Sequence, residues 1–276
     1  LFFILSGYGL TLSQKQNKLN WGKWIFKRIG KLYSTLFIFN LIFFIPLSIY
    51  INKTNFLNFK IIIDTFLFPS GFVFIKALIV FYIIGYPIIK YFSSRATKLV
   101  LLITLILHLV FYILTVDKSA FNIFSYENIP LLMLGWFSLF LFGICIAKDE
   151  ILSRTKFNKF YLIALFGSLI AIYGQRLLIY NDILGWAQII QQYLLFLFCY
   201  TLIFSSKTIV IRSSKLSQLI QYLSSITLEI YLVHVTLLAT FKFELLKFPL
   251  GIFTLITITL IISAIINKIK EYFTKK

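Results

Sequence analysis

Long apolar stretches without a basic residue recur along the whole chain, and they limit what it can fold into. A helix needs roughly 20 such residues to cross the hydrocarbon core of a bilayer. Inside that core each peptide group must find its hydrogen-bond partner within the helix. We therefore predict an all-α, polytopic integral membrane helical bundle with about nine spans. The nine stretches, one of which contains a Glu, are 1–14, 32–51, 77–89, 99–116, 128–147, 160–175, 183–206, 216–241 and 248–267.

The composition agrees with a membrane protein and excludes a soluble globular domain. Hydrophobic residues make up 60% of the chain and charged residues only 13%, whereas soluble domains are about half apolar and a quarter charged. The shortest stretch, 77–89, contains Gly85 and Pro87, and it can span only if Lys76 and Lys90 snorkel or its helix begins near Phe72. No repeat or linker divides the chain, so we expect residues 1–276 to form a single domain.

The basic residues are distributed in a way that indicates membrane topology and not a nucleic-acid partner. Although the net charge is +18, the Lys and Arg residues do not form one patch and instead separate the apolar stretches. Of the 27, 20 lie in alternate loops that begin with 15–31 and end with 268–276, and 7 lie in the other loops. Cytoplasmic loops carry the excess of Lys and Arg. The chain is thus predicted to lie in the cell membrane with its C-terminus in the cytoplasm.

Signatures of several soluble enzyme classes and of metal sites are missing from the sequence. Cys145 and Cys199 both lie inside apolar stretches, where a free cysteine acts as a small hydrophobic residue. No Cys/His spacing typical of a metal site, no Gly-rich phosphate loop and no GxSxG elbow occurs. We expect no metal cofactor.

Four segments resemble elements of a known family. Residues 2–8 read FFILSGY, residues 27–33 read KRIGKLY, and residues 225–234 read SITLEIYLVH. Residues 134–144, LGWFSLFLFGI, are a weaker match. Their order and spacing resemble those of the membrane acyltransferase 3 family, which acylates hydroxyl groups on bacterial cell-surface glycans and related molecules. The resemblance extends over essentially the whole chain and places 27–33 on a cytoplasmic loop, at the entrance of the helix that follows.

The resemblance implies an acyl-CoA donor, such as acetyl-CoA, and a surface glycan or lipid-linked glycan as acceptor. Family members carry an Arg and a His on their first helix, and in the family that His is regarded as the residue that drives the reaction. This resemblance implies that the main base lies upstream of Leu1, that the domain is N-terminally truncated, and that the full protein has ten spans. The sequence departs from the family at Lys31, usually Arg, and at Ser34, usually Pro. Lys lacks the bidentate fork with which Arg grips phosphate.

The late segment contains the candidate catalytic residues, His234 and Tyr231. A His within a span usually faces a bundle interior or a wet cavity, where it could act as a base on a sugar hydroxyl or orient a partner. It could equally be an interfacial His bonded to backbone. The resemblance favours a supporting catalytic role, with Tyr231 one turn earlier on the same face. Glu229 points about 140° away from His234 on the helix, so we do not expect the two to form a catalytic pair.

The remaining candidates bind donor or acceptor. Arg28 and Lys31 are candidates for the phosphates of acyl-CoA, although topology alone also explains cytoplasmic cations. Arg176 and Glu229 are candidates for glycan binding. For Arg176 the alternative is a side chain that snorkels to the interface. For Glu229 it is an ion pair with another helix, for which Arg176 is one possible partner.

Two other polar residues are predicted to serve packing. His108 stands alone in its apolar stretch and is expected to be a packed or lipid-edge His. Ser6 and Gly7 are expected to let two helices approach closely, because no His or acid lies near Ser6 in sequence to activate it as a nucleophile.

Two functions follow from the sequence. The first is transfer of an acyl group, acetyl in the simplest case, from acyl-CoA to a glycan hydroxyl. The alternative is a non-catalytic membrane carrier or export component for lipid-linked glycans. Transporters often have repeated halves, and the absence of such symmetry here favours the enzyme.

Overall fold

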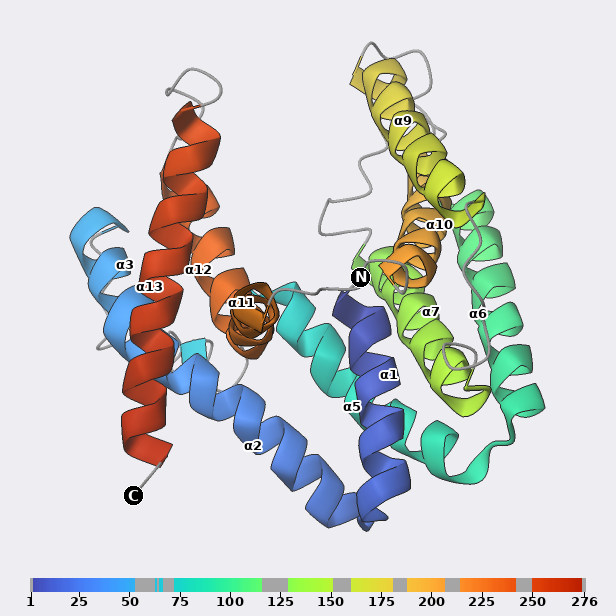
Figure 1. The fold of residues 1–276 in the computed structure, drawn as a ribbon, viewed down its shortest axis with the longest axis horizontal. Coiled ribbons are helices and arrows are strands. Elements are labelled where there is room, and N and C mark those ends of the chain that lie inside the picture. Colours follow the sequence, from blue (N-terminus) through green and yellow to red (C-terminus); the bar gives the residue numbers. More distant parts are fainter. Residues whose placement is uncertain are drawn as a thin grey trace. The chain divides into compact units, whose positions relative to one another are not determined.

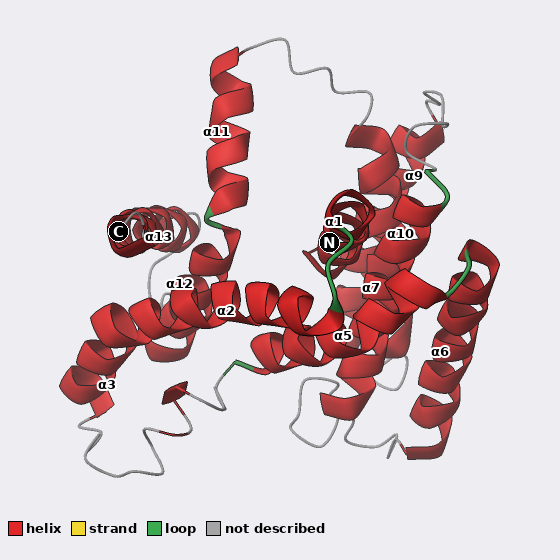
Figure 2. Cartoon of the chain, turned by 90° about the horizontal axis from the view of Figure 1, so that it is seen from below, coloured by secondary structure: helices red, strands yellow, loops and turns green. Residues whose placement is uncertain are grey.

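The structure is a computed structural model that describes residues 2–52, 63, 65–66, 72–115, 129–150, 160–180, 188–206, 214–241 and 250–274. Within these ranges the chain is helical and contains no strand (Figure 2). Two compact units divide the chain: residues 1–21 with 77–210, and residues 22–76 with 211–276. We call them the first and second unit and describe each by itself.

The first unit is built on two helices, α1 and α7, that pack along each other, with α6 against α7 and α9 against α10. Figure 1 shows α1 beside α7. The helices of this unit are α1 (Phe2–Asn17), α5 (Val73–Tyr91) from Ala77 onward, α6 (Ser94–Thr115), α7 (Ile129–Lys148), α9 (Phe160–Tyr180) and α10 (Gln188–Ser206).

Two glycines allow α1 and α7 to approach until their backbones touch. A methyl group added at Gly7 would collide with the carbonyl oxygen of Phe140, and one added at Gly143 would collide with that of Ile4. Small residues permit this approach between membrane helices. The predicted packing role of Gly7 is therefore confirmed. The FFILSGY segment and the weaker 134–144 segment together form this single helix pair.

In the second unit the tightest helix pairing is between α12 and α13. A π-helical turn, η1, continues α2 into α3 and carries the buried Asn40, whose amide donates to the carbonyl of Thr65 at 2.7 Å. The elements of this unit are α2 (Trp21–Phe39), η1 (Asn40–Phe44), α3 (Ile45–Asn52), α11 (Ser214–Ser225), α12 (Thr227–Thr240) and α13 (Leu250–Thr274).

The described residues of all nine predicted stretches lie almost entirely in helices, but not all of these helices have the length of a full span. Among the described residues, five helices are long and apolar enough to cross a membrane, and the bent pair α11–α12 would make a sixth. Residues 160–175 and 189–205 form shorter apolar helices, and α1 has 16 residues. The uncertain stretch 77–89 belongs to α5, which starts at Val73 as its span required. The all-α membrane bundle is confirmed.

Two predicted boundaries were wrong. Residues 27–33 do not form a loop, because α2 begins at Trp21 and includes them. The reason is a buried stripe at helical spacing, Trp24, Leu32, Thr35, Leu36 and Phe39, which keeps this basic segment helical.

The stretch 216–241 is two helices and not one. It bends by 62° at Ile226, where no Pro or Gly is present. Instead, the Ser225 hydroxyl donates to the Tyr222 carbonyl at 2.7 Å, and the Thr227 hydroxyl lies 3.1 Å from the Leu223 carbonyl. Such side-chain bonds to preceding carbonyls bend helices.

Candidate functional site

The bend at Ile226 starts α12, which carries three predicted site residues. Glu229 lies in its first turn, where the helix dipole favours a carboxylate. Its side chain is 1% exposed and accepts a hydrogen bond from Lys270 of α13 in a buried ion pair. The other carboxylate oxygen, Oε2, is buried and has no hydrogen-bond partner among the described residues. An ion pair with another helix, which the sequence left as the alternative to glycan binding, is present, and its partner is Lys270 and not Arg176.

The ion pair continues to α2 through a threonine. The Nζ atom of Lys270 lies 3.5 Å from the hydroxyl of the buried Thr35, which itself donates to the carbonyl of Lys31 at 3.2 Å. This polar chain joins α12, α13 and α2. It places the predicted glycan-binding carboxylate, Glu229, in the same cluster as the backbone of the predicted donor segment. We call Glu229, Lys270 and Thr35 the ion-pair cluster.

The two predicted donor-binding cations differ in their surroundings on α2. Arg28 is half-buried, and it lies on the same stripe as Trp24 and Leu32. Lys31 is exposed. Because the two residues are one helical turn apart, their side chains leave neighbouring positions on the helix surface. An anion with several charged groups could contact both.

Tyr231 and His234 follow Glu229 on α12. The ring of Tyr231 packs against that of Phe74, with 4.3 Å between centroids. His234 is half-buried one turn later, on the same face of the helix as Tyr231. Glu229 and His234 therefore stand on different faces, as the sequence predicts. Arg176 lies in α9, but its side chain is outside the described part of the chain.

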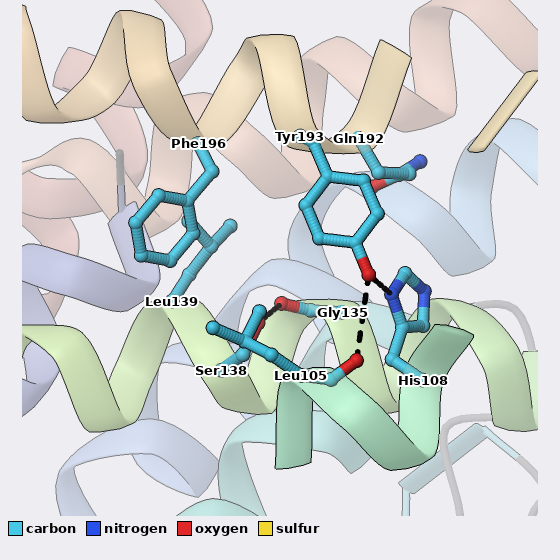
Figure 3. Close-up of a pocket in the computed structure, with 8 residues that line it drawn as sticks. All are labelled: Leu105, His108, Gly135, Ser138, Leu139, Gln192, Tyr193 and Phe196. Atoms are coloured by element: carbon cyan, nitrogen blue, oxygen red, sulfur yellow. Dashed lines mark hydrogen bonds between the residues drawn. The ribbon is translucent and has the colours of Figure 1, made fainter. Parts of the chain in front are cut away.

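His108 in the first unit lines a small pocket, shown in Figure 3. It is 1% exposed, and its Nδ1 lies 3.4 Å from the hydroxyl of Tyr193 on α10. The cavity measures about 10 Å³, which is room for about one water molecule. The Nε2 atom faces this space next to Gly135 and has no hydrogen-bond partner among the described residues. A cavity of this size admits no sugar or acyl chain, and the predicted packing role of His108 is confirmed.

Several other sequence predictions can be compared with the structure. The Ser6 hydroxyl lies 3.4 Å from that of Tyr82, so it joins two helices. Cys145 and Cys199 are buried and free. In the described ranges, no group of three or more His, Cys, Asp or Glu residues could hold a metal ion.

Sequence reasoning missed Lys270 and Thr35. Lys270 was counted only as a topological charge, and Thr35 was not considered. One signal was available: Glu229 is the only carboxylate inside a predicted span, and a buried charge requires a partner. That signal indicates that a cation is needed, but it does not say which of the many Lys and Arg residues supplies it.

Comparison with known proteins gives one match. A family model described as an acyltransferase domain matches residues 1–268. No curated protein and no solved structure matches the chain.

Proposed function

The chain belongs to the acyltransferase 3 family, and from that premise we propose that it transfers an acyl group from an acyl-CoA to a hydroxyl of a cell-surface polysaccharide or lipid-linked glycan. The observation that carries this proposal is the match over residues 1–268. The apolar helices support it further, because a multi-pass membrane protein can meet a donor on one side of the bilayer and a glycan on the other. Acetyl-CoA is the donor to test first.

The proposed reaction is attack of a glycan hydroxyl oxygen on the thioester carbonyl. A carbon–oxygen bond forms, the carbon–sulfur bond breaks, and the hydroxyl proton passes to a base while CoA leaves with the sulfur. We assign His234 a supporting role, orienting the hydroxyl or sharing its proton. Tyr231 lies on the same face of α12, and its packing on Phe74 holds that face in place.

The charged residues have separate roles in this proposal. Arg28 and Lys31 bind donor phosphates, since both are cations on one part of α2. Arg176 contacts the glycan. Glu229 is already paired with Lys270, so we propose that it acts on the acceptor by positioning α12 and therefore His234.

A radiolabelled acetyl-transfer assay tests the proposal. Membranes carrying the unchanged chain or the His234→Ala variant are incubated with labelled acetyl-CoA and cell-surface glycan. We expect label on the glycan with the unchanged chain and a large loss in His234→Ala. The matched control is Leu238→Ala, one turn later on α12 and 50% exposed, which should keep full transfer. No label from any folded and inserted form would overturn the enzyme and favour the carrier.

A further inference from the structure

An open pocket lies in the first unit where α1, α5 and α7 end and α6 begins. Its volume is about 610 Å³, within the range of sites for small-molecule ligands. Its lining includes four lysines and no carboxylate. The lining residues are Thr11, Gln14, Lys15, Lys18, Ile89, Lys90, Phe92, Ser94 and Lys148. We call it the lysine pocket.

Two of the four lysines already form hydrogen bonds within the first unit. The Nζ of Lys148 donates to the carbonyls of Ile88 and Phe92, each at 2.6 Å, and therefore caps the end of α5. The Nζ of Lys15 donates to the carbonyl of Ala147 at 3.1 Å and lies 3.3 Å from a carboxylate oxygen of Glu150. These bonds hold the rim of the pocket together.

The other two lysines remain available to a ligand. Lys18 is exposed, and Lys90 lies 5.4 Å from the ring centroid of Tyr86 and 5.2 Å from that of Tyr91. Neither has a salt bridge among the described residues. The nearby Asp149 pairs instead with Lys98 at 2.6 Å. The pocket consequently offers two positive charges that no described acid neutralises.

A residue that lines this pocket carries a buried acceptor without a hydrogen-bond partner among the described residues. Gln14 is 8% exposed and donates through Nε2 to the carbonyl of Leu19 at 2.9 Å. Its Oε1 atom is buried and has no hydrogen-bond partner in the described part of the chain. Buried polar atoms are nearly always bonded. A ligand that carries an N–H or O–H group would satisfy this oxygen, and its phosphates would meet the lysines.

We propose that the lysine pocket binds a phosphate-bearing ligand that also donates a hydrogen bond to Gln14. This deepens the proposed function and rests on it for the ligand's source, the adenosine 3′,5′-bisphosphate end of the acyl-CoA. That group has phosphates for Lys18 and Lys90, and an amino group and a ribose hydroxyl as donors. The same chemistry occurs in the headgroup of an anionic phospholipid such as phosphatidylglycerol. The lysine pocket is therefore an alternative to Arg28 and Lys31 of α2 as the site that binds the donor phosphates.

Lys18 allows a variant that removes charge without harming the fold. Its φ is 44°, in the left-handed region that glycine adopts without strain. Lys18→Gly therefore deletes the cation while relieving the backbone. Lys90→Gln removes the second cation, and Gln14→Leu removes the acceptor. Lys268→Gln, at an exposed lysine of α13 in the second unit, is the matched control.

The test measures binding of adenosine 3′,5′-bisphosphate to the purified chain in phosphatidylcholine nanodiscs. Loss of one charge-assisted hydrogen bond lowers affinity by about tenfold or more. We expect that loss in Lys18→Gly and in Lys90→Gln, a smaller loss in Gln14→Leu, and none in Lys268→Gln. Adenosine 5′-monophosphate should bind more weakly to the unchanged chain. Equal binding by Lys18→Gly, Lys90→Gln and the unchanged chain would overturn the pocket.

A second arm distinguishes the two sources of phosphate. Nanodiscs containing phosphatidylglycerol are used, and retained lipid is counted by native mass spectrometry. Lipid retention that depends on Lys18, without binding of the nucleotide, would overturn the acyl donor as the source and keep the phosphate site. Neither ligand binding would overturn the proposal outright. Since binding is measured without turnover, a silent acetyl-transfer assay would defeat the proposed function and leave this result standing.

Discussion

The first unit closes its central helix pair with glycines, whereas the second unit buries an ion pair between its central helices. In the first unit, Gly7 and Gly143 let α1 and α7 touch backbone to backbone. In the second, Glu229 and Lys270 join α12 to α13, with side chains only 1% and 14% exposed. One contact depends on shape and the other on charge.

The difference shows that only the second of these two contacts carries a desolvation cost. Close packing of two apolar helices brings no polar group out of water, so it carries no desolvation cost. A buried ion pair costs several kcal/mol per ion in desolvation, and an apolar pair of equal volume is often as stable. The ion-pair cluster is therefore poorly explained by stability alone. Glu229 lies on α12 two residues before Tyr231, and the same helix carries His234 of the proposed acceptor site.

Breaking the ion pair is expected to have the largest effect. Lys270→Met leaves the Glu229 carboxylate buried without its partner, which should lower the free energy of unfolding by about 3–5 kcal/mol. Thermal or denaturant unfolding in detergent measures it. The double variant Glu229→Met with Lys270→Met should recover most of that loss, since no charge remains buried. If the Lys270→Met protein were as stable as the unchanged chain, the ion pair would not be needed to keep Glu229 buried.

The double variant also separates stability from function. If the ion-pair cluster positions α12 for the reaction, the double variant should fold and yet transfer acetyl more slowly, with kcat affected more than KM for the donor. Full transfer by the stable double variant would mean that the pair serves folding only.

Disrupting the glycine contact between α1 and α7 is expected to have the second largest effect. Gly143→Ala places a methyl group against the Ile4 carbonyl of α1, and a backbone cannot move aside as a side chain can. We expect a loss of about 3 kcal/mol in the free energy of unfolding. Gly167→Ala is the control, because a methyl group there meets nothing within 4 Å and alanine favours a helix. Similar stabilities of the two variants would refute the close contact.

The two histidines sharpen the comparison between the units. His234→Gln should reduce acetyl transfer by about 100-fold, the lower range for loss of acid–base assistance, with the unfolding transition unchanged. His108→Gln should do the reverse, lowering the free energy of unfolding by about 1 kcal/mol while the transfer rate stays the same. Parallel measurements of activity and melting on both variants check this. Loss of activity in His108→Gln at full stability would contradict the packing role.

The smallest effect is expected at the partner of His108. Tyr193→Phe removes a hydroxyl that lies 3.4 Å from both the His108 ring and the Leu105 carbonyl. Bonds of this length are weak, so we expect a loss of about 0.5 kcal/mol in unfolding free energy. A loss as large as that in Gly143→Ala would mean that the cavity in Figure 3 is a central support of the first unit.

Much of the architecture was predictable because it depends on the length of the apolar stretches, which can be read directly along the chain. The thickness of a bilayer sets the length of an apolar stretch, and the described residues of the nine stretches are almost all helical. Ser6 and Gly7 in FFILSGY predicted helix packing from residue size, because small residues let two backbones approach closely. Glu229 could be recognised as a buried charge in need of a cation from the sequence around it.

Only the tertiary structure decided which residues meet. Lys270 is 41 positions from Glu229, and the choice of this lysine depends on how α12 and α13 are rotated about their axes. The bend at Ile226 depends on hydroxyl groups competing for carbonyls, and α2 includes the basic segment because its buried stripe begins at Trp24. The lysine pocket likewise gathers the ends of four helices. The sequence determined which segments enter the membrane, because hydrophobicity is summed along the chain; contacts between helices depend on packing that no single segment contains.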